Sequence, residues 1–492
     1  MIIVSSNILN LDEILEGGFY KPSVVLVAGI AGSGKTTFAA QSLFNAARVG
    51  ETCLFISTLS ESPAMINNYM SRFSFFDQTL YETNKMNILS IGESLLKQGQ
   101  EAVIEFIHKK ISILKPDRIV IDPLTVLGDI LSSYETRPLT DDERRGFYFN
   151  LFTSMKSWNT LIIITGEFIM EDLQKSPLGY LADGIIYLSE EIVGMRFERN
   201  LRILKMRGQK YMPGKHSFDI RDSGIVVFPK NLPQVWGEKP ASKIKISTGI
   251  SGLDTMLKGG IIDDDVMLIS GTTGTGKTTF GLHFICDGLH NKENALIISL
   301  EERPSKLVRN ARAFGIDLEP YIQKKMLEVH YVSPVSYHPD EEAWLIKKKI
   351  KENSVKRLLF DGIENLETAL PNSIERKNYM AVLLDLFSSM GVTTVITSEI
   401  SEHFGGVRLT HETLSNVVDN IVLLKHVEIE GNVKGFLSIM KSRGIKHDTE
   451  IREFDITEKG IVVKGSMKGY ESVLSGIARK ISGEFLEKKD KL

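Results

Sequence analysis

The chain has 492 residues, of which 42% are hydrophobic and 25% charged, and its formal net charge is −3. This balance is typical of a soluble globular protein, and a pI near 6.4 disfavours a nucleic-acid-binding protein, which needs basic stripes. No apolar span reaches the length of a membrane helix, and the N-terminus lacks the basic start of a secretory signal. We therefore expect a cytoplasmic protein with no membrane segment, in which Cys53 and Cys286 stay reduced.

The first motif in chain order is GIAGSGKT, which follows the apolar run SVVLVAG and opens a helix-compatible stretch. Strand, glycine-rich loop and helix in this order predict a P-loop. Its backbone N–H groups and lysine would hold phosphate, and its threonine hydroxyl would reach Mg²⁺. The predicted nucleotide-binding residues here are Gly29, Ala31, Gly32, Ser33, Gly34, Lys35, Thr36 and Thr37.

Further strand-like runs follow, separated by helical patterns: CLFIST, RIVID, TLIIIT and GIIYLS. Apolar strands that alternate with helices predict a parallel sheet buried on both faces. The alternating runs NLRILKMRG and HSFDIRDSGIVVF then predict an antiparallel extension. Asp122 ends RIVID in the Walker B position, so Thr36 and Asp122 are the predicted metal residues of this half.

The same landmarks recur in the second half at nearly constant offsets, from Lys35 to Lys277, from Asp122 to Asp361 and from Arg207 to Arg443. Such an internal repeat predicts a tandem duplication. We expect an α/β protein with two RecA-like P-loop domains, over residues 1–235 and 243–476, and a tail over 477–492. The proline-rich stretch PKNLPQVWGEKPAS between the halves is typical of a linker.

The second P-loop, GTTGTGKT, follows the run VMLISG. Thr278 and Asp361, which ends RLLFD, are the predicted metal residues of this half. The predicted nucleotide-binding residues are Gly271, Thr273, Gly274, Thr275, Gly276, Lys277, Thr278 and Thr279.

Hydrolysis also needs a carboxylate that can orient or deprotonate the attacking water. Glu301 and Glu302 directly follow the strand-like run ALIISL, so we expect them near the γ-phosphate. The matching place in the first half holds Ser60 and Glu61. Because serine is no general base here, the first domain should hydrolyse its nucleotide slowly unless Glu61 takes the role.

Each half also carries a pair of cations two residues apart, Lys205 with Arg207 and Lys441 with Arg443. Alternation along a strand would send both side chains of a pair to one face. The pair lies far along the chain from its own P-loop, so we expect it to reach the phosphates of a neighbouring subunit. An arginine supplied in this way would make hydrolysis depend on assembly.

Several further motifs accompany the duplicated P-loops: the leaders NLDEILEGG and SGLDTMLKGG, the LEERP segment, the MRG and SRG strands and the VLLKHVEI run. In this combination the chain resembles the KaiC-like ATPases of the RecA superfamily. The resemblance covers nearly the whole chain. It implies a homohexamer in two rings, with ATP and Mg²⁺ between adjacent subunits. The paired glutamates and the Lys-x-Arg strand would then serve opposite sides of one site in a slow ATP-driven switch.

The resemblance also implies serine autokinase activity in the second ring. KaiC proteins carry a Ser-Thr acceptor pair there, and the aligned residues here are Ser415 and Asn416. Ser415 is therefore the candidate phosphate acceptor, while Asn416 has no hydroxyl, so a two-site cycle is not expected. In the tail, Leu474, Ile477, Ile481 and Phe485 recur at helical spacing, which predicts an amphipathic helix that could dock a regulatory protein.

Two other functions stay open. A RecA- or DnaB-like motor would be stimulated by DNA, although the basic residues are spread along the chain rather than clustered. A scaffold would use ATP only to assemble and would not depend on Glu301 for turnover.

Overall fold

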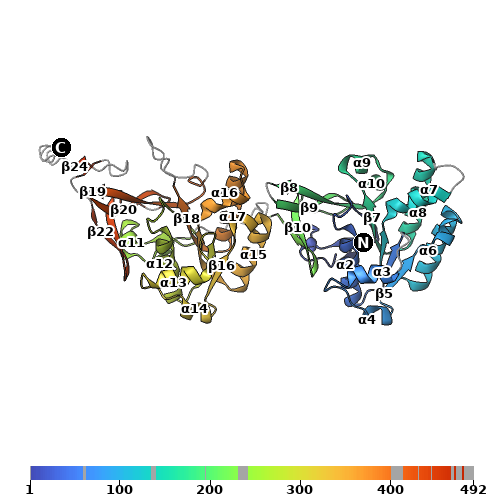
Figure 1. Cartoon of the computed structure of the whole chain (residues 1–492), viewed down its shortest axis with the longest axis horizontal. Coiled ribbons are helices and arrows are strands. Elements are labelled where there is room, and N and C mark those ends of the chain that lie inside the picture. The colour runs from blue at the N-terminus through green and yellow to red at the C-terminus, as the bar shows by residue number, and fades with distance from the viewer. Residues whose placement is uncertain are drawn as a thin grey trace. The chain divides into compact units, whose positions relative to one another are not determined.

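The computed structural model describes residues 2–58, 63–134, 140–193, 196–230, 242–400, 414–429, 431–444, 446–466, 470–471 and 479–480. The chain divides into two compact units, Met1–Lys230 and Asn231–Leu492 (Figure 1). Each unit contains one nine-stranded sheet. No helix among these described residues is long and apolar enough to cross a membrane.

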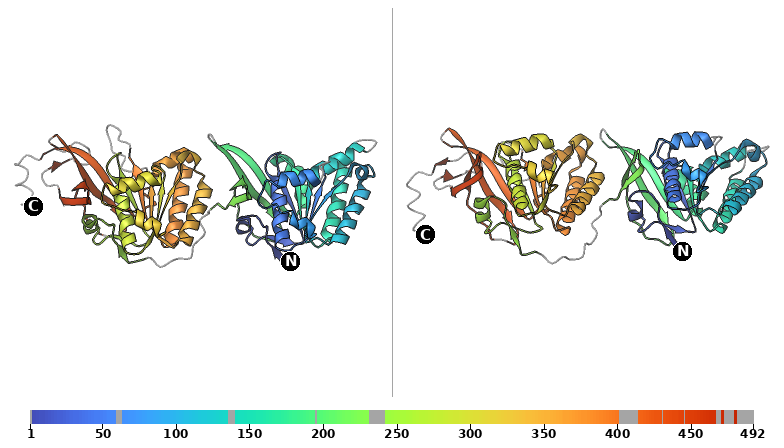
Figure 2. Two further views of the ribbon diagram at one scale, coloured as in Figure 1. Left: turned by 60° about the horizontal axis from the view of Figure 1, so that its bottom comes forward. Right: turned by 90° about the horizontal axis from the view of Figure 1, so that it is seen from below.

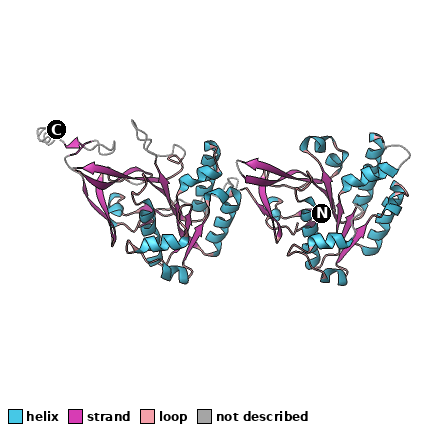
Figure 3. Cartoon of the chain, viewed as in Figure 1, coloured by secondary structure: helices cyan, strands magenta, loops and turns pink. Residues whose placement is uncertain are grey.

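The first sheet has a parallel part and an antiparallel part. In spatial order it consists of β11 (Gly224–Phe228), β10 (His216–Arg221), β9 (Arg196–Met206), β8 (Gly184–Val193), β3 (Ser23–Gly29), β7 (Leu161–Glu167), β6 (Arg118–Asp122), β4 (Cys53–Ser57) and β5 (Met86–Ser90). The strands from β8 to β5 are parallel, and β9, β10 and β11 extend the sheet as antiparallel neighbours (Figure 3). The P-loop strand β3 therefore lies inside the sheet.

The second sheet repeats this arrangement. Its spatial order is β16 (Leu327–Tyr331), β15 (Asn294–Ser299), β17 (Val355–Asp361), β18 (Thr393–Glu399), β14 (Val266–Gly271), β19 (Asn420–Ile429), β20 (Asn432–Ser442), β21 (Arg452–Thr457) and β22 (Gly460–Ser466). Strands β16 to β19 are parallel, and β20 to β22 are antiparallel. Short pairs accompany the sheets: β1 (Ile2–Val4) with β2 (Phe19–Lys21), β12 (Lys245–Ile246) with β13 (Ile261–Ile262), and β23 (Tyr470–Glu471) with β24 (Arg479–Lys480).

Helices lie on both sides of each sheet (Figure 2). In the first unit they are α1 (Leu11–Ile14), α2 (Lys35–Arg48), α3 (Pro63–Met70), α4 (Thr79–Glu82), α5 (Glu93–Leu96), α6 (Gln100–Leu114), α7 (Leu124–Tyr134), α8 (Asp141–Ser157), α9 (Met170–Lys175) and α10 (Pro177–Leu181). In the second they are α11 (Ser251–Met256), α12 (Lys277–His290), α13 (Pro304–Arg312), α14 (Glu319–Gln323), α15 (Pro339–Glu352), α16 (Leu366–Ala369) and α17 (Ser373–Ser389), with 3₁₀ turns η1 (Pro334–Ser336) and η2 (Ile363–Asn365).

The strand alternation explains the two-sided cover. In β3, Val25 and Val27 pack in the same core cluster as α2, whereas Val24 and Leu26 pack with α6 and α8. Successive side chains of a strand leave opposite faces, so a strand that is apolar throughout needs helices on both sides. This confirms the predicted fold class, two tandem RecA-like domains with an antiparallel extension.

Three short elements depart from the sequence prediction. Strands β5 and β16 were not predicted, because their sequences MNILS and LEVHY are short and largely half-buried, as sheet edges are. In the tail, Arg479 and Lys480 form β24 with Tyr470 and Glu471, where the spacing predicted a helix. The apolar residues of that prediction lie outside the described residues.

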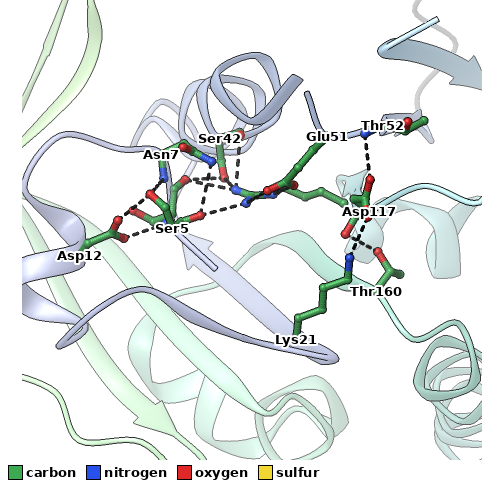
Figure 4. A network of polar contacts seen from close by, with 11 residues as sticks. Ser5, Asn7, Asp12, Lys21, Ser42, Glu51, Thr52, Asp117 and Thr160 are labelled. Carbon is green, nitrogen blue, oxygen red and sulfur yellow. Dashed lines mark hydrogen bonds and ion pairs between the residues drawn. The ribbon is translucent and has the colours of Figure 1, made fainter. Parts of the chain in front are cut away.

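A buried arginine anchors the N-terminal segment of the first unit. Arg118 is fully buried and binds both carboxylate oxygens of Glu51 at 3.1 Å. It also donates to Ser42 Oγ of α2 at 2.7 Å and to the Ser5 carbonyl at 2.9 Å (Figure 4). In the second unit Arg357 donates in the same way to the Ser247 carbonyl. A buried guanidinium needs such a complete set of acceptors, so each leader segment is tied to the helix that follows its P-loop.

Candidate active sites

Each P-loop joins the carboxyl end of a buried strand to the first turn of a helix. The loops run from β3 to α2 and from β14 to α12. Gly34 and Gly276 precede the two helices at φ 94° and 87°, in the left-handed region that favours glycine. A Cβ on Gly276 would also lie 2.3 Å from Ile456 Cδ1 of β21, so the loop is closed by the antiparallel extension. The predicted nucleotide-binding residues lie at the end of the preceding strand (Gly29 and Gly271), in these loops or in the first turn of the following helix.

Several groups in these loops fit a phosphate ligand. Neither α2 nor α12 has a side-chain cap, so the N–H groups of their first turns point out of the helix ends. Ser33 Oγ is buried and has no hydrogen-bond partner among the described residues. The residues therefore suit a nucleoside triphosphate with Mg²⁺.

The P-loop lysines lie over their own loops. Lys35 Nζ donates to the Ile30 carbonyl at 2.7 Å, and Lys277 Nζ donates to the Thr272 carbonyl at 3.0 Å. Burial lowers the pKa of Lys35, while the carboxylates of Glu167 and Asp122 raise it. Lys35 therefore lies within the electrostatic influence of Asp122, the Walker B residue.

The second half places the predicted metal residues in contact. Thr278 Oγ1 lies 3.1 Å from Asp361 Oδ1, and Thr397 Oγ1 donates to the same carboxylate oxygen at 2.6 Å. Asp361 is fully buried. Burial raises the pKa of Asp361 to about 6, against the opposing hydrogen bond from Thr397. A divalent cation would offset the free-energy cost of burying the charged Asp361 carboxylate, since it stabilises that form.

In the first half, Asp122 is also buried and accepts a hydrogen bond from Thr165, the counterpart of Thr397. Thr36 follows Lys35 at the start of α2 and is exposed. The two halves therefore share the strand-end aspartate and the threonine that orients it.

The two adjacent glutamates of the second half point to different places. Glu302 accepts a hydrogen bond from Asn310 at 3.0 Å and pairs with Lys306 at 3.0 Å, so its side chain belongs to α13. Glu301 instead lies across Gly362, next to the Walker B strand, where it feels the charge of Lys277. Only Glu301 of the predicted pair therefore faces the phosphate-binding loop.

Glu301 is accompanied by carboxylates that the sequence analysis missed. Glu364 on η2 and Glu399 at the end of β18 both contribute to raising the pKa of Glu301. Burial is the largest cause that raises the pKa of Glu301 to about 7, followed by Glu364. Neither Glu364 nor Glu399 belongs to a known motif; only their positions after the ends of strands β17 and β18 could have indicated them.

In the first half, Ser60 and Glu61 lie outside the described residues. The predicted contribution of Glu61 to hydrolysis has no described geometry.

The cation pairs bind the segment that precedes the neighbouring strand of the sheet, β8 in the first half and β19 in the second. Lys205 donates to the Tyr180 carbonyl at 3.0 Å, and Arg207 donates to the same oxygen at 2.9 Å. Lys441 donates to the Ser415 carbonyl at 2.7 Å. Arg443 donates to the Asn416 carbonyl at 2.9 Å. The arginines lie one residue beyond β9 and β20, a small correction to the prediction that both cations of a pair lie on the strand.

The strand register separates these cations from their own P-loop. Met206 pairs with Gly184, and Gly184 pairs with Val25 near the beginning of β3. The P-loop begins at the other end of β3, at Gly29, four residues or about 13 Å further along. The second half has the same register between Ser442, Asn420 and Met267. Neither pair can therefore reach the phosphates of its own domain without rearrangement.

Ser415 lies in the turn that Lys441 holds and is half-buried. Its neighbour Asn416 is exposed. Thr410 and Thr413, the nearby hydroxyl residues that could accept phosphate in place of Ser415, lie outside the described residues.

The comparisons with known proteins agree with this architecture. A family model described as the KaiC ATPase matches residues 4–232 and again residues 246–468. The circadian clock oscillator protein KaiC of Thermostichus vulcanus is 30% identical over 491 residues, which cover 97% of this chain and 92% of that protein. The protein of the same name from Synechococcus elongatus is 29% identical, over 96% of this chain and 91% of its own length.

The family model matches each of the two units separately and together accounts for most of the chain. The duplicated P-loops, the Walker B aspartates and the antiparallel extensions lie within the matched residues. The chain therefore belongs to the KaiC family of ATPases.

Proposed function

We propose that the second domain hydrolyses ATP with Glu301 as the general base. The position of Glu301 carries this proposal, because it lies across Gly362 beside the Walker B strand and close to Lys277. Its carboxyl group has a pKa of about 7, raised mainly by burial. A base with a pKa near the working pH is efficient in proton transfer.

The reaction would proceed by attack of water on the γ-phosphorus. Glu301 takes a proton from the water while the new O–P bond forms and the bond to the β-phosphate bridging oxygen breaks. The products are ADP and inorganic phosphate. The N–H groups at the start of α12 and the ammonium group of Lys277 hold the phosphates during this step.

Thr278 and Asp361 would hold Mg²⁺, which neutralises charge on the phosphate oxygens when bound. In the first domain Thr36 and Asp122 would take the same part. Thr165 and Thr397 orient the two aspartates through their hydroxyl groups.

A matched pair of variants tests the base. Glu301→Gln should lower the turnover of the second domain about 100-fold or more, because the water loses its proton acceptor. Glu302→Gln should leave turnover within about twofold, because Glu302 is bound to Lys306 and Asn310. Phosphate release measured on the full-length chain distinguishes them. Unchanged turnover in Glu301→Gln would favour a scaffold that needs ATP only for assembly.

We further propose that the active assembly is a homohexamer in two rings with ATP between adjacent subunits. The register supports this, since Lys205, Arg207, Lys441 and Arg443 lie at the end of each sheet opposite to their own P-loop. In a ring these cations would reach the phosphates of the neighbouring subunit. The first ring would bind ATP and turn it over slowly, so that the whole assembly works as a slow switch.

A serine autokinase activity is a second candidate for the second ring. Ser415 supports it, because its backbone carbonyl is bound by Lys441, one of the cations proposed to reach a neighbouring phosphate. The Ser415 residue and Lys441, which is proposed to reach the phosphates of a neighbouring subunit, therefore lie in one hydrogen-bonded turn.

Intact-protein mass spectrometry after incubation with Mg-ATP tests this activity. We expect one added phosphate per chain, and its loss in Ser415→Ala. Asn416→Ala serves as the control, since Asn416 is adjacent, exposed and lacks a hydroxyl. Phosphate that persists in Ser415→Ala would assign the acceptor to another residue.

A further inference from the structure

The arginine of each Lys-x-Arg pair lies against an aspartate that directly precedes the neighbouring strand of the sheet. In the second domain Arg443 Nη1 lies 3.6 Å from Asp419 Oδ1, and Asp419 precedes β19. In the first domain Arg207 Nη1 lies 3.4 Å from Asp183 Oδ1, and Asp183 precedes β8. The ion pair therefore occurs twice, at matching places in the two sheets.

Each aspartate is fixed by the backbone as well as by the arginine. The second carboxylate oxygen of Asp419, Oδ2, accepts from the Val266 N–H at 3.0 Å, and the Asp419 N–H donates to the Val266 carbonyl at 3.0 Å. Asp183 is bound by Val24 in the same two ways, at 3.1 Å and 2.8 Å. Val266 and Val24 lie at the beginning of the P-loop strands β14 and β3. One oxygen of each carboxylate is thus held by a strand, and the other is directed to the arginine.

The Arg443 guanidinium is held at one edge and left open elsewhere. Its Nη2 donates to the Asn416 carbonyl at 2.9 Å, so both terminal nitrogens contact residues just before β19. The Arg443 side chain stays 55% exposed, whereas that of Asp419 is 27% exposed. An ion pair with so exposed a cation contributes little to the free energy of unfolding. Its effect is on the direction of the guanidinium, whose planar set of donors binds phosphate well only in a matching orientation.

We infer that Asp419 is a positioning residue for the trans arginine: its fixed carboxylate holds Arg443 so that the open part of the guanidinium meets the phosphates of the neighbouring subunit. This inference rests on the proposed function, in which Arg443 acts across the subunit interface. Asp419 touches Arg443 rather than the reacting atoms.

Two other roles of Asp419 lead to different expectations. If Asp419 only supports β14 through Val266, it belongs to the P-loop side of the interface, because β14 leads into the P-loop. If its carboxylate only neutralises Arg443, its removal frees the cation for phosphate and raises turnover.

Asp419→Asn separates these roles. The asparagine oxygen can accept from the Val266 N–H as the aspartate does, so the contact with β14 is kept. The amide nitrogen then faces the guanidinium, and two donors cannot bond each other. Asp385→Asn is the matched control, since it makes the same substitution at an exposed position of α17.

The first measurement is kcat for Mg-ATP on the full-length chain, with the rate of Glu301→Gln subtracted to isolate turnover in the second domain. We expect kcat to fall about tenfold in Asp419→Asn, because a misdirected arginine stabilises the transition state less well. Asp385→Asn should keep kcat within about twofold of the parent. In the Arg443→Ala background, Asp419→Asn should cause no further loss, because it acts through Arg443.

The second measurement uses mixed rings to find the side of the interface on which Asp419 acts. Equal amounts of Asp419→Asn and Glu301→Gln chains should reach about a quarter of the parent turnover. About one interface in four then joins an intact Asp419–Arg443 pair to an intact Glu301. Asp419→Asn mixed with Arg443→Ala should stay at the mean of the two separate variants, because both changes damage the same side. Native mass spectrometry checks that both chains enter one ring.

Three outcomes would overturn the inference: an unchanged or faster kcat in Asp419→Asn, a further loss in the Arg443→Ala background, or rescue by Arg443→Ala chains instead of Glu301→Gln chains. The last would assign Asp419 to the support of the P-loop strand. Failure of the proposed function is recognised separately, since Arg443→Ala and Glu301→Gln chains would then not rescue each other.

Discussion

Glu301 and Asp361 beside the second P-loop influence the charge of one another. Burial raises the pKa of Asp361 to about 6 and that of Glu301 to about 7. Each carboxylate also raises the pKa of its neighbours by repulsion, as Glu301 does for Asp361. Repulsion between neighbouring carboxylates lowers the free energy of unfolding. It is typical of functional sites, where a bound cation or a reacting group reduces the repulsion.

The pKa of Glu301 predicts a pH dependence of turnover. Glu301 acts as a base only when it is deprotonated, so turnover should rise between about pH 6 and pH 8. Steady-state phosphate release across this range measures the effect. The residual rate of Glu301→Gln should lack this rise, and a rate of the parent protein that falls over the same range would contradict the assignment.

Asp265 predicts an effect on stability. Burial is the main cause that raises its pKa to about 6, and the neighbouring Asp419 contributes. The folded state therefore binds this proton more tightly than the unfolded state. The stability that protonation contributes is present near pH 4 and is lost as the pH rises through about 6.

We therefore expect Asp265→Asn to stabilise the protein at pH 7.5 by about 1 kcal/mol, a value reduced for the partial exposure of Asp265. The asparagine oxygen can still accept the hydrogen bond from Asn420. Near pH 4 the variant and the parent should unfold at similar temperatures. Thermal unfolding at both pH values measures the difference. Asp385→Asn, which makes the same substitution at an exposed position, serves as the control. Equal stabilisation at both pH values would argue against the protonation of Asp265 as its cause.

At the level of elements, strong local signals made most of the fold predictable. The buried parallel strands are continuous apolar runs, and each P-loop combines a strand, glycines and a helix start. Edge strands β5 and β16 lack such a signal, because one side of an edge strand faces solvent and tolerates polar residues. Short, half-polar strands are therefore the part of this sheet that sequence patterns do not reveal.

The site was predictable where its chemistry is local in sequence. Lys277, Thr278 and Asp361 follow from motifs, and their contacts are those expected of the motifs. Glu302 was predicted together with Glu301 but binds Asn310 and Lys306 of α13 instead, because this helix offers it nearer partners. Adjacency along a chain does not determine which of two side chains faces a ligand.

Glu364 could not be predicted for a related reason. Its carboxylate accepts from the Glu399 backbone N–H and raises the pKa of Glu301, and both of these residues are distant from it in sequence. Its counterpart in the first half, Thr125, accepts from the Glu167 backbone N–H and is likewise recognised only from the strand register. Tertiary contacts, rather than local pattern, define this part of the site.

For the whole molecule, the two units share one architecture but differ around the phosphate site. Both have the strand-end aspartate, its threonine and the cation pair. Among the described residues, the second has the contacts of Glu399 with Thr273 and Glu364, where the first has the contact of Glu167 with Thr125 and has Ala31 at the position of Thr273. Duplication has therefore kept the nucleotide-binding frame while the surroundings of the reacting phosphate have diverged.

A mixing experiment tests whether subunits share their sites. Arg443→Ala removes a proposed trans cation, and Glu301→Gln removes the base. Each variant alone should lose most second-domain turnover. Rings assembled from equal amounts of both should regain about a quarter of the parent turnover, because about one interface in four combines the intact residues. Turnover equal to the mean of the separate variants would mean that each site lies within one subunit.

The position of the Lys-x-Arg pairs has a consequence for solution behaviour. In the proposed ring these pairs serve the P-loop of a neighbouring subunit, so a solitary chain would carry complementary halves of different sites rather than one complete site. Dilution would then abolish turnover by mass action while leaving nucleotide affinity partly intact, and protein concentration itself would regulate the enzyme.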